Sequence, residues 1–384
     1  MSKIIEINLY KVPPRWVFIK ITTSDGIVGW GEPVIEGKAD TVITAVKEFS
    51  RHLIGADSNR IEDIFQIMYR GSFYRGGPIL MSAISGIEQA LWDIKGKRLG
   101  VPIYDLMGGP VRDKMQIYSW VGGDDPSELV EAILERKEAG FNHVKMNALG
   151  KVNWLESPEQ IDAIVKNIHQ IRDKVGWDIN IGLDFHGRVR KALAKVLVKE
   201  FEPVKPMFIE EPVLTEHLDT LKTIVEHSNI PIATGERVYG RWGFKPILEH
   251  GYVDIIQPDL SHAGGIWEVR KIAAMAEAYD VAIAPHCPLG PIGFAASLQM
   301  DFCTPNAMIQ ETSLGIHYHE NSVDLLDYLK SPEVFDVNDG FIKRNNLPGL
   351  GIEIDEDKVV REAENGHDWH NPIWRQDDGT IAEW

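Results

Sequence analysis

The stretch Gly182-Leu-Asp-Phe-His186 ends a short apolar run on an acid, and two later stretches repeat this pattern. These are Phe208-Ile-Glu-Glu-Pro212 and Ala233-Thr-Gly-Glu-Arg237. The acids at positions 184, 210 and 236 lie 26 residues apart, close to the length of one βα unit. Because parallel strands need a crossover between them, this equal spacing predicts neighbouring parallel strands that each end in a carboxylate.

Short apolar runs of this kind alternate with amphipathic helical stretches along most of the chain. Eight runs occur, at residues 116–120, 143–146, 179–183, 206–209, 232–233, 253–256, 281–284 and 308–309. Eight βα units in about 200 residues fit a (β/α)8 barrel, whose active site lies at the carboxyl ends of its strands. The alternative, a doubly wound sheet, needs a glycine-rich phosphate-binding turn after an early strand, and this sequence has none.

The segments on either side of the barrel predict a second unit. Apolar patterning indicates strands at residues 4–12 and 16–23, a further strand after Asp25-Gly26, and helices at 40–54, 61–69 and 81–99. The tail holds Trp369, Trp374 and Trp384, so we expect it to pack on the rest of the protein. We therefore predict an α/β protein with a (β/α)8 barrel over residues 116–329. An α+β capping domain over 1–115, completed by 330–384, covers this barrel.

Charge and composition exclude several classes of partner. The chain has 384 residues, 40 Lys plus Arg against 57 Asp plus Glu, and a net charge of −17. Such a charge repels nucleic acid and anionic membranes, so we expect neither as a partner. A small anionic substrate is compatible with it only if the site supplies positive charge locally. Two cysteines, no signal-peptide pattern and no long apolar run predict a cytoplasmic protein without disulfides.

Three carboxylates at neighbouring strand ends indicate a metal site. Asp184, Glu210 and Glu236 would repel one another strongly without a cation. An all-oxygen set of ligands suits Mg²⁺, which completes its coordination with water and substrate oxygens. Glu211 follows Glu210 directly, and strand alternation predicts that it points to the other face.

Two histidines and an aspartate lie at the same predicted end of the barrel. His186 follows Asp184 by two residues, on the same side of a segment that we expect to be extended. His286 ends the seventh run, one strand from Asp259, and a carboxylate behind a histidine fixes its tautomer and raises its basicity. A metal, a base and a second proton donor can together dehydrate a 2,3-dihydroxy acid to a 2-keto-3-deoxy acid. His262 is interpreted as structural.

The two-domain order and this series of residues resemble the mandelate racemase branch of the enolase superfamily. The stretches Pro13-Pro-Arg-Trp16, Gly71-Ser-Phe-Tyr-Arg-Gly-Gly-Pro78, Ser119-Trp-Val-Gly-Gly123 and Ala382-Glu-Trp384 resemble acid-sugar dehydratases of that branch, so the similarity extends over essentially the whole chain. It implies Mg²⁺ on the three acids, His286 polarised by Asp259 as the base at C2, and His186 as the acid at C3. It also implies that Glu311 hydrogen-bonds the enediolate, and that the protein is a homo-oligomer. A histidine base with Mg²⁺ is the general pattern of this superfamily.

The implied reaction is the Mg²⁺-dependent dehydration of D-galactonate, a hydro-lyase reaction. Another aldonate such as D-gluconate is an alternative substrate, since sugar acids that differ at one hydroxyl are separated by few contacts. A catalytically silent binding protein on the same fold is a more remote alternative.

One departure from the branch favours dehydration over racemisation. Racemases there carry Lys-x-Lys on the second strand, whereas this chain has Lys145-Met-Asn147, and Asn cannot act as a base. Lys145 either contacts the substrate or fills the barrel interior. Further substrate contacts are predicted from Asn147, from Arg15 and from the Tyr74-Arg75 loop, although these cap segments are equally compatible with ordinary surface loops.

Overall fold

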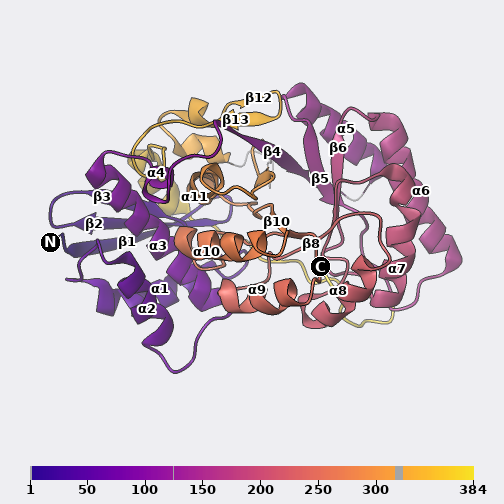
Figure 1. The fold of residues 1–384 in the computed structure, drawn as a ribbon, viewed down its shortest axis with the longest axis horizontal. Coiled ribbons are helices and arrows are strands. Elements are labelled where there is room, and N and C mark those ends of the chain that lie inside the picture. The colour runs from indigo at the N-terminus through magenta and orange to yellow at the C-terminus, as the bar shows by residue number, and fades with distance from the viewer. Residues whose placement is uncertain (1, 124, 316–322) are drawn as a thin grey trace.

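The computed structural model describes residues 2–123, 125–315 and 323–384. The N-terminal part begins with an antiparallel sheet in the order β1-β2-β3. Its strands are β1 (Ile4–Val12), β2 (Trp16–Thr23) and β3 (Val28–Gly31). Helices α1 (Ala39–Leu53), α2 (Ile61–Arg70) and α3 (Gly77–Leu99) follow, with the short α4 (Ile103–Leu106) after them. These elements form the predicted cap beside the barrel (Figure 1).

Parallel strands form the barrel in chain order. They are β4 (Lys114–Val121), β5 (His143–Asn147), β6 (Asn180–Asp184), β7 (Ile209–Glu210), β8 (Ile232–Thr234), β9 (Ile255–Ile256), β10 (Ala282–Ile283) and β11 (Gln310–Thr312). The ring closes because β11 pairs in parallel with β4, while a bridge from Ile283 to Ala307 joins β10 to the segment before β11. The predicted barrel with an N-terminal cap is confirmed.

Helices cover the outside of the barrel (Figure 1). They are α5 (Pro126–Glu138), α6 (Pro158–Val175), α7 (Lys191–Glu200), α8 (Leu218–Val225), α9 (Gly240–Glu249), α10 (Ile266–Glu277) and α11 (Pro291–Phe302). Capping residues fix the starts of two of these helices. The side chains of Asp125 and Ser157 accept hydrogen bonds from the backbone amides of Ser127 and Gln160, and both helices open with proline.

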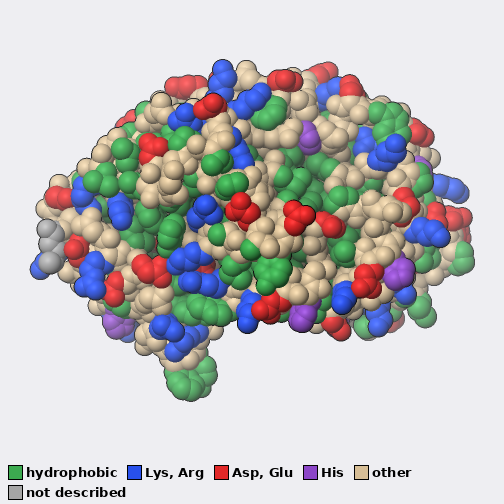
Figure 2. All heavy atoms as spheres, viewed as in Figure 1, with side chains coloured by type: hydrophobic (Ala, Val, Ile, Leu, Met, Phe, Trp, Pro, Cys, Tyr) green, Lys and Arg blue, Asp and Glu red, His purple; other side chains and the backbone are tan. Residues whose placement is uncertain are grey.

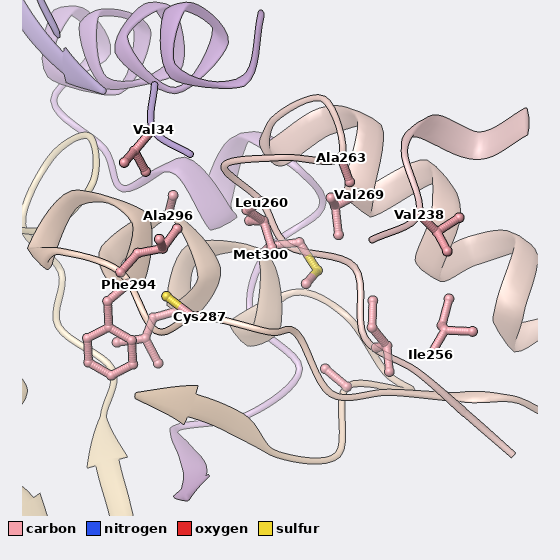
Figure 3. Close-up of a cluster of buried hydrophobic side chains, with 14 of the residues drawn as sticks. Val34, Val238, Ile256, Leu260, Ala263, Val269, Cys287, Phe294, Ala296 and Met300 are labelled. Carbon is pink, nitrogen blue, oxygen red and sulfur yellow. The ribbon is translucent and has the colours of Figure 1, made fainter. Parts of the chain in front are cut away.

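Two clusters of buried apolar side chains form the core, and the larger one joins the barrel to the cap. Inside the barrel, Tyr118, Phe208, Ala233, Ile255, Ala284 and Ile309 form a separate buried cluster. The larger core continues from the barrel helices into the cap. Figure 3 shows Val34, which follows β3, pointing toward the side of α11 that carries Ala296. The cap is therefore packed against barrel helix α11 by side chains with almost no exposure.

The C-terminal tail contacts both parts. Strand β13 (Phe341–Lys343) pairs with β12 (Val337–Asn338) and, antiparallel, with β4 of the barrel. Helix α12 (Glu356–Asn365) lies against the cap, where Val359 is fully buried and Glu356 pairs with Lys20. The tail therefore packs as its tryptophans suggested, but it joins the barrel sheet as well as the cap.

The visible surface mixes acidic and basic side chains rather than showing one extended acidic face (Figure 2). In the described residues, no helix is long and apolar enough to cross a membrane.

Candidate active site

A cavity of about 600 Å³ lies where the carboxyl ends of the strands meet the cap and the tail. Its walls include Arg15, Glu36, Pro78, Trp120, Lys145, Asn147, His186, Arg188, Glu236, Arg237, Tyr239, His262, His286, Glu311, Trp369, Trp374 and Trp384. Barrel residues supply the charged base of this cavity, while the tail supplies three tryptophans of its wall and the cap adds Arg15, Glu36 and Pro78.

Carboxylates and one lysine form the charged base. Asp184 on β6 is directly paired with Glu210 on β7, so the two side chains stand at the same level. Lys145 on β5 is 1 % exposed, and its Nζ lies 2.9 Å from Glu210 Oε2, 2.9 Å from Glu311 Oε1 and 3.5 Å from Asp184 Oδ2. Lys145 thus lies in the barrel interior and also borders the cavity, which combines the two placements considered from the sequence.

These groups hold each other away from their ordinary pKa values. Burial would lower the pKa of Lys145, but Glu210 and Glu311 outweigh it and hold that pKa well above the ordinary value. Burial and the charge of Asp184 raise the pKa of Glu210, with Lys145 only partly opposing them. If all of these carboxylates were ionised, they would carry more negative charge than one ammonium group balances, and Glu210 accordingly holds its proton more tightly than a free glutamate.

Asp184, His186 and Glu236 each place one ligand atom within 4.8 Å of the others, a geometry that can hold a metal ion. Glu210, the third expected ligand, instead turns Oε2 toward Lys145 and accepts a hydrogen bond from Gln257 at 2.7 Å. Its Oε1 is buried with no hydrogen-bond partner. An acceptor-only atom of this kind, beside Asp184, fits a hard cation.

His286 and Asp259 form a hydrogen-bonded pair on the far side of the ring from β6. His286 Nδ1 lies 2.9 Å from Asp259 Oδ2, and the ring's Nε2 lies 3.2 Å from Glu236 Oε2. Burial would lower the pKa of His286, but Glu236, Glu311 and Asp259 raise it to about 10. The bond to Asp259 leaves Nε2 as the atom that faces the cavity.

His186 is held differently from the expectation of an extended segment. Its backbone is left-handed, with φ +49°, so the chain turns directly after β6. The His186 amide donates to Asp184 Oδ1 at 2.8 Å, and Nε2 lies 3.0 Å from Asp184 Oδ2. Burial would lower the pKa of His186, but Asp184 raises it above its ordinary value. The turn folds the ring back over the carboxylate beside which it was expected.

Comparison with known proteins identifies the family. Residues 12–108 match the N-terminal domain of mandelate racemase/muconate lactonizing enzymes, and residues 128–358 match the enolase C-terminal domain-like family. The chain belongs to the mandelate racemase/muconate lactonizing enzyme family of the enolase superfamily. The cluster at the base of the cavity is accordingly a divalent-metal site of that superfamily.

Individual relatives cover the whole chain. D-galactonate dehydratase from Ralstonia pickettii (strain 12J) is 54% identical over 382 residues, which is 100% of both chains. An enolase from Agrobacterium radiobacter, solved with bound Na and L-malate, is 28% identical with a TM-score of 0.91 over 100% of both chains. An enolase from Pantoea ananatis with bound D-gluconate and Mg is also 28% identical over 100% of both chains, with a TM-score of 0.88.

Other residues of this enolase-superfamily site adjust the picture from sequence. Glu211 pairs with Arg237, which also donates to the His186 carbonyl at 3.0 Å. Strand alternation does not explain this placement, because the strand ends at Glu210 and Glu211 is itself left-handed, with φ +41°. Glu311 accepts from the Cys287 amide at 2.9 Å, which fixes its carboxylate beside the seventh strand end.

The cap residues divide into two groups. Arg15 borders the cavity, donates to the Pro288 carbonyl at 3.2 Å and lies 3.6 Å from Glu36. The structure does not place Tyr74 and Arg75 at the cavity: both are exposed, and Tyr74 is 80% exposed. Their loop between α2 and α3 projects from the body of the molecule (Figures 1 and 2). Only Pro78 of that stretch reaches the cavity wall.

Sequence reasoning missed part of the wall. His262, interpreted as structural, borders the cavity, with Nδ1 2.9 Å from Ser82 Oγ and Nε2 3.8 Å from Asp259 Oδ2. Its position three residues after Asp259, in the loop beyond a barrel strand, was the available signal. The tail tryptophans were expected to pack, but nothing in their spacing pointed to the mouth of the cavity.

Proposed function

We propose that this protein dehydrates D-galactonate to 2-keto-3-deoxy-D-galactonate with Mg²⁺ as its metal. The observation that carries the proposal is the full-length 54% identity to D-galactonate dehydratase, together with two histidines on opposite sides of one metal cluster. His186 follows β6 and His286 follows β10, four strands apart in a ring of eight.

Asp184, Glu210 and Glu236 are the proposed metal ligands. Glu210 Oε1 has no hydrogen-bond partner, which supports Glu210 as the third metal ligand. With Glu210 as a ligand, His186 is not needed on the metal and is available for proton transfer. Bound Mg²⁺ supplies positive charge that neutralises the carboxylates, draws in the substrate carboxylate and offsets the charge that develops when C2 loses its proton.

His286 is the proposed base. Its Nε2 takes the proton from C2, while Asp259 holds the opposite nitrogen and stabilises the charged ring that results. The ring must first be neutral. Glu236 is the largest of the charges that keep the proton on it and is also a proposed metal ligand, so a metal held there would lower the pKa of His286.

His186 is the proposed acid. The electron pair from the C2–H bond is first delocalised into the substrate carboxylate as an enediolate. It then forms the C2–C3 double bond as the C3–O bond breaks, and His186 gives its proton to the departing hydroxyl, which leaves as water. The resulting enol becomes the 2-keto acid. Asp184 supports this role because its charge outweighs the effect of burial and raises the pKa of His186 above the ordinary value.

Glu311 is proposed to hydrogen-bond the enediolate, and Lys145, Asn147 and Arg15 are proposed to position the substrate. Lys145 is engaged by three carboxylates, so it serves as a fixed charge rather than as a base. Asn147 cannot take a proton. With one competent base, removal of the C2 proton leads to elimination instead of inversion at C2. Tyr74 and Arg75, on the projecting loop, are not included.

A panel of aldonates tests the function. The purified protein is incubated with each sugar acid, with and without EDTA, and 2-keto-3-deoxy product is measured. We expect turnover of D-galactonate that EDTA abolishes and added Mg²⁺ restores. D-gluconate is the second candidate, favoured by the Pantoea ananatis enolase that binds D-gluconate and Mg. Turnover of D-gluconate alone would overturn the first choice, and no turnover at all would favour a silent binding protein.

We further propose that the protein is a cytoplasmic homo-oligomer. Each subunit is proposed to have a barrel domain over residues 116–329 and a capping domain over residues 1–115 and 330–384. Phe73 and Tyr74, 90% and 80% exposed on the projecting loop, support self-association. Two free, buried cysteines agree with a reducing compartment. Light scattering of the purified protein tests the oligomer, and a single-chain mass would contradict it.

A further inference from the structure

A buried acid of the cap accepts two hydrogen bonds from the segment that follows His286. Glu32 follows β3 and is fully buried. Its Oε1 accepts from the Gly290 amide at 2.7 Å, and its Oε2 accepts from the Gly293 amide at 2.8 Å. These amides open α11, directly after the His286 loop. A side chain at Gly290 would meet Glu32 Oε1 at 2.7 Å, so a glycine is required for this approach.

A buried glutamine side chain of the cap donates a hydrogen bond to the loop that carries Asp259. Gln89 on α3 donates through Nε2 to Ser261 Oγ at 3.0 Å. The Ser261 amide in turn donates to Asp259 Oδ1 at 2.6 Å, on the carboxylate that also binds His286. These two sets of hydrogen bonds are connected, because Gln89 Oε1 accepts from the Glu32 backbone amide at 2.9 Å.

The contacts therefore close a hydrogen-bonded ring across the cap and the barrel. In order, its members are His286, Asp259, Ser261, Gln89, Glu32 and Gly290, which lies four residues beyond His286. We propose that Glu32 and Gln89 are positioning residues that set the His286–Asp259 geometry, an inference that rests on the proposed function of that pair. A base must be held close to its productive geometry, and groups behind it supply that restraint.

Among the described residues, Glu32 is buried without a counter-charge, which carries a folding cost that its contacts must offset. Its carboxylate makes no ion pair with any residue in the described ranges. Burial raises the pKa of Glu32 to about 8, against the lowering effect of the two amide donors. A buried acid without a cation is costly to fold, so its presence is better explained by what it holds.

Glu88 provides a matched control. It is also a buried cap acid, and it accepts from the Ile266 and Trp267 amides at 2.7 and 2.9 Å at the start of α10. Burial raises its pKa to about 8 as well. Glu88 is not a member of the ring, so its replacement by Gln should match the folding cost of Glu32→Gln without disturbing the pair.

The experiment compares Glu32→Gln, Gln89→Met and Glu88→Gln in the full-length protein. In the first two variants we expect kcat to fall about tenfold or more with KM changed less than about threefold. Exchange of the C2 proton with deuterated solvent should fall by the same factor, because the fault lies at the base. Glu88→Gln should lose a similar amount of thermal stability and keep kcat within about threefold. If Glu32→Gln does not fold, Gln89→Met carries the test alone.

Crystal structures of the variants give a readout that does not depend on turnover. We expect the His286 Nδ1 to Asp259 Oδ2 distance to stay near 2.9 Å in Glu88→Gln. In Glu32→Gln and Gln89→Met it should exceed about 3.5 Å, the limit of a hydrogen bond. The same distance in all variants, or an equal loss of kcat in Glu88→Gln, would overturn the proposal. Failure of the wild-type protein to dehydrate any aldonate would overturn the proposed function, and the distances would still decide the positioning role.

Discussion

His286 and His186 are anchored by different carboxylates, so their removal should affect different steps. For His286→Asn we expect folding and Mg²⁺ binding to persist while kcat falls about 1,000-fold, within the range for loss of a general base. Asn keeps a polar group of similar size near Asp259 but cannot accept the C2 proton. Proton NMR in deuterated solvent should show neither product nor C2 exchange. Activity close to wild type would show that another group is the base.

His186→Asn should separate proton removal from loss of the hydroxyl. The base pair His286–Asp259 is intact in this variant, so C2 exchange should continue, whereas dehydration should fall by about 100-fold or more because the C3 hydroxyl leaves without a proton donor. NMR follows both on one sample. Unchanged product formation would contradict the acid role, and loss of exchange together with dehydration would point to a role in metal binding.

The positions of functional side chains were predictable at the strand ends but not beyond them. Asp184 ends β6, and Glu236 and His286 follow β8 and β10 by two and three residues, so all three reach one end of the barrel, and strand spacing is visible in the sequence. The direction of the His186 ring depends on a left-handed turn. The hydrogen bond from the His186 backbone amide to Asp184 stabilises this turn, and no local sequence pattern encodes it. The outward course of the Tyr74 loop is equally invisible, since flanking glycines permit many directions.

Elements were predicted more reliably in position than in length. Strands β7, β9 and β10 contain two residues each, although the apolar runs that indicated them have four. Apolar residues next to these strands, such as Val281 before β10, fill the core while their backbone bonds elsewhere: the Val281 amide donates to the Ala276 carbonyl of α10 at 3.0 Å. Hydrophobic patterning reports burial, and it reports hydrogen-bonded pairing only indirectly.

The tail after α12 should contribute to substrate binding rather than to folding. Trp369 and Trp374 border the cavity, and each lies under an arginine, with Arg15 5.1 Å and Arg188 4.8 Å from the respective ring centres. Deleting residues 367–384 leaves α12 on the cap. We therefore expect cooperative thermal unfolding to persist and KM to rise about tenfold, since part of the wall is lost.

Steady-state kinetics and circular dichroism of the truncated protein check this expectation. Trp374→Phe is a milder control that keeps an aromatic wall and should change KM much less. If KM is unchanged after truncation, the tail does not form a working wall of the cavity.

The whole molecule should be stabilised by Mg²⁺, and more strongly as pH rises. Without a cation the cluster retains protons: Glu210 has a raised pKa, and the pKa of His286 is about 10 in the folded protein against 6.5 for an unperturbed ring. A raised histidine pKa stabilises the folded state fully below pH 6.5, and this contribution is lost as pH rises through 10. Metal-free protein should therefore lose stability between pH 6.5 and 9.

Mg²⁺ displaces these protons, so its apparent affinity should increase by up to about tenfold per pH unit for each proton released. With Mg²⁺ at about 100 times its dissociation constant, the gain in unfolding free energy is about 2.7 kcal/mol. Thermal unfolding at pH 6.5, 7.5 and 9 with EDTA or fixed Mg²⁺ measures this, and we expect the difference in melting temperature to widen with pH. Glu236→Gln, which removes a ligand and the largest charge acting on His286, should abolish the widening. A Mg²⁺ effect that is constant or shrinks with pH would show that binding releases no protons and that the ligands are already deprotonated in the metal-free protein.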